Sequence, residues 1–307
     1  MVSTVAVADD QCGGMSETSI EGVTMDHVAH AVPRWQDVWN RYAVDLGAEW
    51  SSGGLGRGFA PAQLRFGNGA RVEVLMPNDS HLNDFLQRFL TASGPGPHHL
   101  TFKVPDLTSA IELARRAGLE PIGIDRRDPE WLEAFLHPRT ATGVVVQMAE
   151  AYGIWTSPPP DDFPVARRQR VDDGGPVPAA ELRWVVHAVA DLDSALTLFG
   201  GLLGGHVVGR GDRSDHRWVE LSWGGPLGLR LVTPIEGSSN TPLSRWLAGR
   251  PGRVHHLAFI AEEPGHIPGV EPADRERVGL DIGWGIDEQW VIGSKVNSGL
   301  QLIIEAP

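Results

Sequence analysis

Cysteine is almost absent from the 307-residue sequence, which contains only Cys12. A single cysteine excludes a disulfide within the chain and a metal site built from cysteines, and it agrees with a reduced, cytoplasmic setting. Long apolar runs are also missing, because no segment approaches the roughly 18 apolar residues that a membrane span needs. Met1 to Met15 lacks the basic and apolar sections of a secretion signal. We therefore expect no association with a membrane.

Positive charge is scarce as well. Lysine and arginine together number 26 against 39 acidic residues, which gives a net charge of −13. An acidic surface repels phosphates, so we expect no nucleic-acid partner. The remaining composition, with 41% hydrophobic and 21% charged residues, is ordinary for a globular protein. The length is sufficient for two domains, each with a core of its own.

The pattern of apolar residues predicts a strand, a helix and three strands, and then the same order again, in the first half of the chain. Apolar residues at helical spacing indicate helices at residues 33–46, 82–90 and 108–117. Strands are expected at residues 23–32, 49–52, 62–66, 70–76, 96–104, 120–125, 132–137 and 143–149. Gly67-Asn-Gly is typical of the tight turn of a hairpin.

The same pattern restarts after residues 152–179, whose proline-rich and glycine-containing composition indicates a linker. Val254–Phe259 matches Pro97–Phe102, and the shift is constant for the pairs His27/Trp184, Glu73/Arg230 and His99/His256. A constant register over several elements indicates a tandem repeat. We expect a disordered tail at residues 1–22, a first domain at 23–151, the linker at 152–179, and a second domain at 180–307.

Four residues of the first repeat are candidate metal ligands. His27, Glu73, His99 and Gln147 each lie in a different predicted strand, inside an apolar segment. Histidine together with carboxylate suits Zn, Ni, Co, Fe or Mn. Glu73 stands between two valines, and a buried carboxylate requires a partner. That partner is a metal, an arginine, or two histidines.

Four motifs of the first repeat resemble the vicinal oxygen chelate superfamily, and within it the branch of methylmalonyl-CoA epimerase and glyoxalase I. They are His27-Val-Ala-His-Ala-Val, Val72-Glu-Val-Leu-Met-Pro, His98-His-Leu-Thr-Phe-Lys-Val and Phe135-Leu-His-Pro-Arg-Thr-Ala-Thr-Gly-Val-Val-Val-Gln. The resemblance implies an α+β fold of tandem domains. Each domain consists of two βαβββ modules that form a curved mixed sheet around a cleft. It also implies one divalent cation, held from the first and last strands of each module.

Carried onto this sequence, the resemblance places the four ligands at His27, Glu73, His99 and Gln147, with His98 pointing away from the cleft. Similar epimerases and glyoxalases carry glutamate at the position of Gln147, where it serves as a base. An amide oxygen can bind a metal but accepts no proton at neutral pH. Glu73 is therefore the expected catalytic base, with His30 and His137 as weaker alternatives.

The second repeat offers Trp184, Arg230, His256 and Ile303 at the corresponding places, so we expect it to bind no metal. Its role is then to pair with the first domain, or to form a pocket in which Trp184 stacks and Arg230 holds an acid. Arg139, with two further arginines, is a candidate for receiving an anionic substrate. Because the ligands all lie in one repeat, we expect no exchange of modules between the domains.

Three functions are compatible with these features. The first is a metal-dependent isomerase, epimerase or lyase that acts on a small carbonyl or acyl substrate through a metal-stabilised enolate or enediolate. The second is an extradiol-type dioxygenase that uses Fe(II). The third is a protein that binds and sequesters a drug or another small molecule. The chain is expected to be a monomer or a homodimer.

Overall fold

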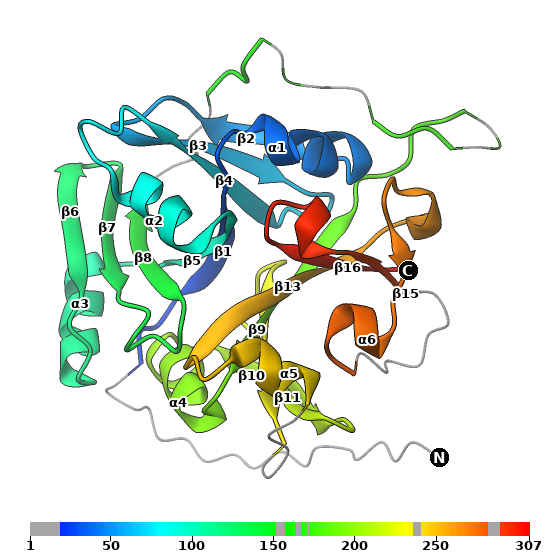
Figure 1. The fold of residues 1–307 in the computed structure, drawn as a ribbon. Helices are drawn as coiled ribbons and strands as arrows, with labels where there is room; N and C mark the ends of the chain where they lie inside the picture. Colours follow the sequence, from blue (N-terminus) through cyan, green and yellow to red (C-terminus); the bar gives the residue numbers. More distant parts are fainter. Residues whose placement is uncertain are drawn as a thin grey trace.

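The computed structural model describes residues 19–151, 157–161, 163, 167–170, 172, 174–235, 241–281 and 289–307. Each half of the chain forms one eight-stranded mixed sheet, and Figure 1 shows the two sheets packed together. The strand order of the first sheet is β2-β3-β4-β1-β5-β8-β7-β6, and that of the second is β10-β11-β12-β9-β13-β16-β15-β14. Both modules of each half therefore lie in the same sheet, and the expected absence of module exchange is confirmed.

The strands of the first sheet are β1 (Thr24–Ala31), β2 (Glu49–Gly53), β3 (Gly58–Arg65), β4 (Arg71–Asn78), β5 (Gly96–Lys103), β6 (Ile122–Asp128), β7 (Trp131–Leu136) and β8 (Val145–Ala151). The strands of the second are β9 (Glu181–Val189), β10 (His206–Asp212), β11 (His216–Ser222), β12 (Gly228–Pro234), β13 (Gly252–Ile260), β14 (Glu271–Pro272), β15 (Gln289–Ile292) and β16 (Gln301–Glu305).

The helices are α1 (Gln36–Trp39), α2 (Phe85–Ser93), α3 (Leu107–Arg116), α4 (Leu192–Leu196), α5 (Pro242–Leu247) and α6 (Arg275–Val278). Single π-helical turns, η1 (Asn40–Asp45) and η2 (Thr197–Leu202), continue α1 and α4, and two 3-10 turns are η3 (Pro264–His266) and η4 (Ser294–Val296). The predicted order of one strand, one helix and three strands is present in both modules of the first half. None of the helices within the described ranges has the length and apolar character needed to cross a membrane.

The central strands of each sheet carry matching irregularities. Along β1 and β5 the pairing skips Asp26 and then His98, so each is an extra residue that bulges out of its strand. The second sheet repeats this pattern on β9 and β13, where Arg183 and His255 are skipped. A bulge interrupts the alternation of side chains and redirects the side chain of the extra residue. The duplication therefore extends to local defects of the sheet.

One hydrophobic core joins the two halves. Phe66 of the first half contacts Phe259 of the second with ring centroids 5.0 Å apart, and Phe102 lies 5.0 Å from Trp223. These rings belong to a single buried cluster with residues from both sheets. The described parts of the expected linker are packed as well, since Phe163 lies 4.7 Å from Trp39. Most of the expected tail, residues 1–18, lies outside the described residues.

Two buried histidines at equivalent positions link the halves. Nε2 of His30 in β1 donates to the carbonyl oxygen of Ser298 at 2.8 Å, and Nε2 of His187 in β9 donates to the carbonyl oxygen of Thr142 at 2.9 Å. Burial lowers the pKa of both histidines to about 4, so both are neutral. Ser298 and Thr142 both have positive φ angles, at 46° and 51°. The interface is therefore approximately two-fold symmetric.

Candidate metal centre

The pairing register brings three of the predicted ligands onto one face of the first sheet. Ala29 on β1 lies opposite both Glu73 on β4 and His99 on β5. His27 is two residues from Ala29, and side chains two apart on a strand share a face. Gln147 on β8 joins the same face, because it pairs with Thr101, which in turn pairs with His27.

The spacing of these side chains fits a divalent cation. Oε2 of Glu73 lies 3.6 Å from Nε2 of His27 and 3.5 Å from Nε2 of His99, and the three ligand atoms all lie within 4.8 Å of one another. Metal–ligand bonds of about 2.0–2.2 Å separate neighbouring ligand atoms by about 3–3.5 Å. Nε2 of His99 is buried and forms no hydrogen bond within the described residues. The donor set and its geometry therefore suit a cation that His27, Glu73 and His99 hold together.

His27 is oriented by a neighbouring carboxylate. Its Nδ1 donates to Oδ2 of Asp26 at 2.7 Å, and the bulge at Asp26 allows adjacent residues to make this contact. Asp26 also pairs with Arg71, and at 3.3 Å with Lys103. Burial alone would lower the pKa of His27, but the carboxylates of Glu73 and Asp26 raise it to about 9. A carboxylate behind a histidine is typical of metal ligands, because it fixes the ring and increases its basicity.

His99 is held by its neighbour His98. The two Nδ1 atoms are 2.8 Å apart, so one ring donates to the other. Burial, together with the charges of His98 and His27, lowers the pKa of His99 well below its usual value. His98 packs against Phe89 at 4.7 Å, yet it also lines the cavity. The expectation that His98 points away from the cleft was therefore wrong, and the bulge at His98 is the reason.

Gln147 lies beside the group of three through a bridging hydroxyl. Oγ1 of Thr101 donates to Oε1 of Gln147 at 2.6 Å and lies 2.9 Å from Nε2 of His27. On its other side, Nε2 of Gln147 donates to Oε2 of Glu133 on β7 at 2.6 Å. Burial raises the pKa of Glu133, against the opposing effect of hydrogen bonds from Trp131 and Gln147.

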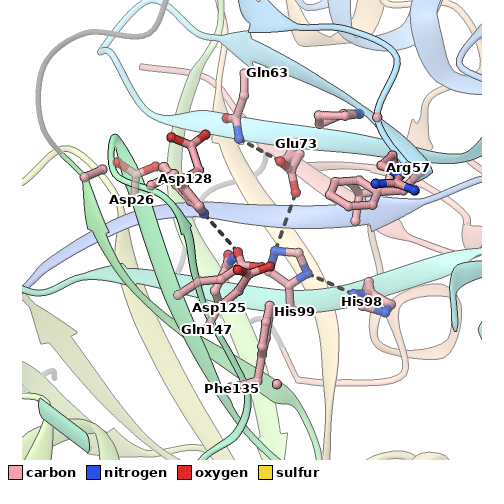
Figure 2. A pocket seen from close by; sticks show the side chains of 18 of the residues that line it. Asp26, Arg57, Gln63, Glu73, His98, His99, Asp125, Asp128, Phe135 and Gln147 are labelled. Carbon is pink, nitrogen blue, oxygen red and sulfur yellow. Dashed lines mark hydrogen bonds and ion pairs between the residues drawn. The ribbon is translucent and has the colours of Figure 1, made fainter. Parts of the chain in front are cut away.

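Sequence reasoning missed two residues of this site, Gln63 and Glu133. Nε2 of Gln63 donates to Oε1 of Glu73 at 3.0 Å across the β3–β4 hairpin, as Figure 2 shows. Each is a polar residue inside a largely apolar strand, at the alternate position that faces the cleft. That is the same signal that identified Glu73, and it was available in the sequence for both.

The site opens into a cavity of about 1240 Å³. Its wall combines apolar side chains with polar ones, and Figure 2 shows Glu73, His99, Phe135 and Gln147 around it. Arg126 and Arg127 line the cavity, whereas Arg139 is not among the lining residues, and its backbone N–H donates to His137 in the turn before β8. His30, an alternative base, lies in the interface between the halves rather than in the cavity.

The corresponding face of the second sheet carries different side chains. Nε of Arg230 donates to Oε1 of Glu220 at 2.9 Å, and the guanidinium lies over the ring of Trp184 at 5.3 Å from its centroid. His256 keeps the partnership seen in the first repeat, with its Nδ1 2.8 Å from Nδ1 of His255. Ile303 pairs with Ala258 as Gln147 pairs with Thr101. The only cluster of metal-ligating residues found in the described part of the chain is that of His27, Glu73 and His99.

Comparison with known proteins adds a family to this geometry. Residues 26–135 match the profile of the Glyoxalase/Bleomycin resistance protein/Dioxygenase superfamily. No curated protein matches the chain. Among solved structures, a mutant of 4-hydroxymandelate synthase from Streptomyces coelicolor has a TM-score of 0.56 at 14% sequence identity, covering 78% of this chain and 71% of that one.

Two smaller structures match about half of the chain. Methylmalonyl-CoA epimerase from Mycobacterium tuberculosis has a TM-score of 0.39 at 25% identity, covering 46% of this chain and 94% of that one. A hypothetical protein from Bacillus halodurans C-125 has a TM-score of 0.40 at 25% identity, covering 43% and 97%. The residues that match the profile lie in the first sheet, and the two sheets have the expected tandem arrangement. The first half of this chain contains a domain of the glyoxalase/bleomycin resistance protein/dioxygenase, or vicinal oxygen chelate, superfamily.

Proposed function

We propose that the protein is a divalent-metal-dependent isomerase, epimerase or lyase that removes a proton next to the carbonyl group of a small carbonyl or acyl substrate. The observation that supports this most is the convergence of His27, Glu73 and His99 on one another beside a cavity that Glu73 and His99 line, with Nε2 of His99 left without a hydrogen bond in the described structure. These three residues would hold the cation, with the amide oxygen of Gln147 beside them. When bound, such a cation polarises a carbonyl oxygen and stabilises the enolate or enediolate that proton loss creates.

The protein's own groups account for binding and proton transfer. Apolar residues such as Phe59 and Phe135 line the cavity and would exclude water from the substrate. Glu73 is the proposed proton acceptor, because it lies at the edge of the cluster and also lines the cavity. Its Oε1 atom accepts a hydrogen bond from Gln63, which fixes the orientation of the carboxylate.

Deuterium exchange tests this proposal. In deuterated water, the metal-loaded protein should exchange the proton next to the carbonyl of a 2-methyl acyl thioester or of an α-hydroxy carbonyl compound, and proton NMR records the loss of signal. The variant Glu73→Gln should show no exchange above the solvent background. Absence of exchange from every such compound, in protein shown to contain metal, would contradict the proposal.

The donor set itself favours a second candidate. Two histidines and one carboxylate with open positions are typical of non-haem Fe(II) oxygenases, so an extradiol-type dioxygenase remains an alternative. Anaerobic loading with Fe(II), followed by measurement of oxygen consumption with catechols, separates the two activities. Protein that takes up no metal at all would instead favour the sequestering role.

A further inference from the structure

A continuous chain of hydrogen bonds runs from the cavity wall to the first of the proposed ligands. Nε1 of Trp131 donates to Oε2 of Glu133 at 2.9 Å, and Nε2 of Gln147 donates to the same oxygen at 2.6 Å. Oγ1 of Thr101 donates to Oε1 of Gln147 at 2.6 Å and lies 2.9 Å from Nε2 of His27. The amide of Gln147 is therefore hydrogen-bonded through both its oxygen and its nitrogen.

The two ends of an amide differ in what they can bind. The oxygen accepts hydrogen bonds and can approach a cation, whereas the NH₂ group only donates and repels one. The hydroxyl of Thr101 can donate or accept, so it tolerates either orientation of the amide. The carboxylate of Glu133 only accepts, and a reversed amide would place oxygen against oxygen at 2.6 Å. Glu133 is thus the partner that decides which end faces Thr101 and the metal cluster.

We propose that Glu133 is a positioning residue that aims the amide oxygen of Gln147 at the cation held by His27, Glu73 and His99. The inference rests on the proposed function only in requiring that a cation binds there. Glu133 contacts no proposed ligand other than Gln147 among the hydrogen bonds of the described residues, and it acts through that amide. Its effect is therefore on the orientation of a ligand, and the chemistry of proton removal is not assigned to it.

The second repeat supports this reading by contrast. Gln289 stands at the position of Glu133, Ile303 at that of Gln147, and Glu305 directly opposite Gln289. Nε2 of Gln289 donates to Oε1 of Glu305 at 2.9 Å, so an amide and a carboxylate also meet on these strands. Neither of these two side chains, however, stands at the position of Gln147, which in the first repeat pairs with the bridging residue Thr101 on β5. The second repeat therefore has no amide at the position of Gln147, where Ile303 stands instead.

Binding of Co²⁺ tests the proposal directly. The variant Glu133→Gln keeps the size of the side chain but can both donate and accept, so the amide of Gln147 becomes free to reverse. We expect Co²⁺ affinity, measured by calorimetry, to fall about tenfold to 100-fold, which is the usual effect of losing an outer partner of a metal ligand. The visible absorption spectrum of the bound Co²⁺ should change, because one oxygen ligand is lost. The variant Glu133→Asp, which retains a carboxylate, should restore most of the affinity.

The matched control is Glu130→Gln, because Glu130 also lines the cavity but makes no hydrogen bond to Gln147. It removes the same charge, so an equal loss of affinity there would show that Glu133 acts only through charge and would overturn the proposal. Gln147→Leu provides a second test that does not depend on the folding of the Glu133 variants. Glu133→Gln should add no further loss in the Gln147→Leu background, since the two residues act as one unit.

The outcomes separate this inference from the proposed function. If the unaltered protein binds Co²⁺ and Glu133→Gln binds it equally well with the same spectrum, only the role of Glu133 is refuted. If the unaltered protein binds no Co²⁺, both proposals fail together. Circular dichroism on each variant establishes that it is folded before its affinity is compared.

Discussion

The two sheets of this protein provide different partners for a partly buried carboxylate. In the first, Glu73 on β4 faces two histidines and accepts a hydrogen bond from Gln63 on β3. In the second, the carboxylate stands on the equivalent of β3, as Glu220, and Arg230 replaces Glu73 as its cross-strand partner. A buried charge requires a counter-charge. The second repeat supplies the counter-charge as the guanidinium of Arg230, whereas for the first we propose a cation taken from solution.

Other parts of the two clefts are alike, and they show what belongs to the scaffold. The histidine pairs His98–His99 and His255–His256 both have their Nδ1 atoms 2.8 Å apart. In each pair the first ring packs against an aromatic residue of the preceding helix, Phe89 in one repeat and Trp246 in the other. A histidine at this place is therefore compatible with a cleft that has no metal cluster. The difference between the repeats depends on Glu73 and His27, whose places Arg230 and Trp184 take.

The largest expected effect comes from removing the carboxylate that distinguishes the first cleft. Glu73→Gln should reduce metal affinity by more than the roughly 100-fold typical of changes to outer partners, because it removes a ligand itself. Metal content after dialysis, measured by plasma mass spectrometry, checks this. Glu220→Gln, which removes the carboxylate of the corresponding hairpin in the second repeat, is the matched control and should leave metal content unchanged. Retention of a full equivalent of metal by Glu73→Gln would exclude Glu73 as a ligand.

Substitutions at the Glu220–Arg230 pair of the second sheet should change the free energy of unfolding rather than metal binding. Glu220→Ala removes the carboxylate that pairs with Arg230, a residue only 7% exposed. Breaking a buried ion pair from one side costs about 3–5 kcal/mol, less here because Glu220 is partly exposed, so we expect a loss of about 2–3 kcal/mol in the free energy of unfolding. Urea denaturation measures it. Gln63→Ala in the first repeat breaks a hydrogen bond to a partly exposed carboxylate and should cost about 1–2 kcal/mol. Equal losses would contradict the contrast between the clefts.

The interface between the repeats should respond to acid. His187 has its pKa lowered by burial from 6.5 to about 4. Below pH 6.5 the unfolded chain binds a proton that the folded chain does not, so stability falls as the pH falls towards 4. Between pH 7 and pH 5 this one histidine should account for about 2 kcal/mol, since each pKa unit corresponds to about 1.4 kcal/mol.

Urea unfolding of His187→Gln at the two pH values isolates that contribution. Glutamine can still donate to the carbonyl of Thr142 but does not titrate, so the variant should lose about 2 kcal/mol less on acidification than the unaltered chain. A glutamine at the equivalent His30 should have a similar effect, because its pKa is also lowered to about 4 by burial. An unchanged pH dependence in both variants would show that these histidines do not report on unfolding.

The sequence was sufficient for the central part of the site but not for its surroundings. His27, Glu73 and His99 were identified because polar residues inside apolar strands stand out, and because the motifs that contain them resemble those of the vicinal oxygen chelate superfamily. The contact between Asp26 and His27, and the position of His98, depend on bulges, which a regular alternation cannot reveal. Glu133 was missed although it is a polar residue inside an apolar strand, and its contact with Gln147 depends on the pairing of β7 with β8, which is a long-range property of the sheet. The strands of the first half were predicted to within a few residues, and β3 begins at Gly58 rather than at residue 62.

The smallest expected effect is also the most direct test of the comparison, since it converts the second cleft into the first. His256 already stands at the position of His99, with its Nε2 buried and without a hydrogen bond in the described structure. The combined substitutions Trp184→His, Glu220→Gln and Arg230→Glu would reproduce the residues at His27, Gln63 and Glu73. We expect a second equivalent of Co²⁺ to bind, but more weakly than the first, because Ile303 supplies no amide and Arg183 stands where Asp26 would support the new histidine. Calorimetric titration with Co²⁺ gives the stoichiometry, and the single change Arg230→Glu, which lacks the second histidine, should not reach two equivalents. If the triple variant is folded and still binds only one equivalent, the three side chains are not sufficient, and the proposed contributions of Asp26 and of the Glu133–Gln147 pair to metal binding gain support.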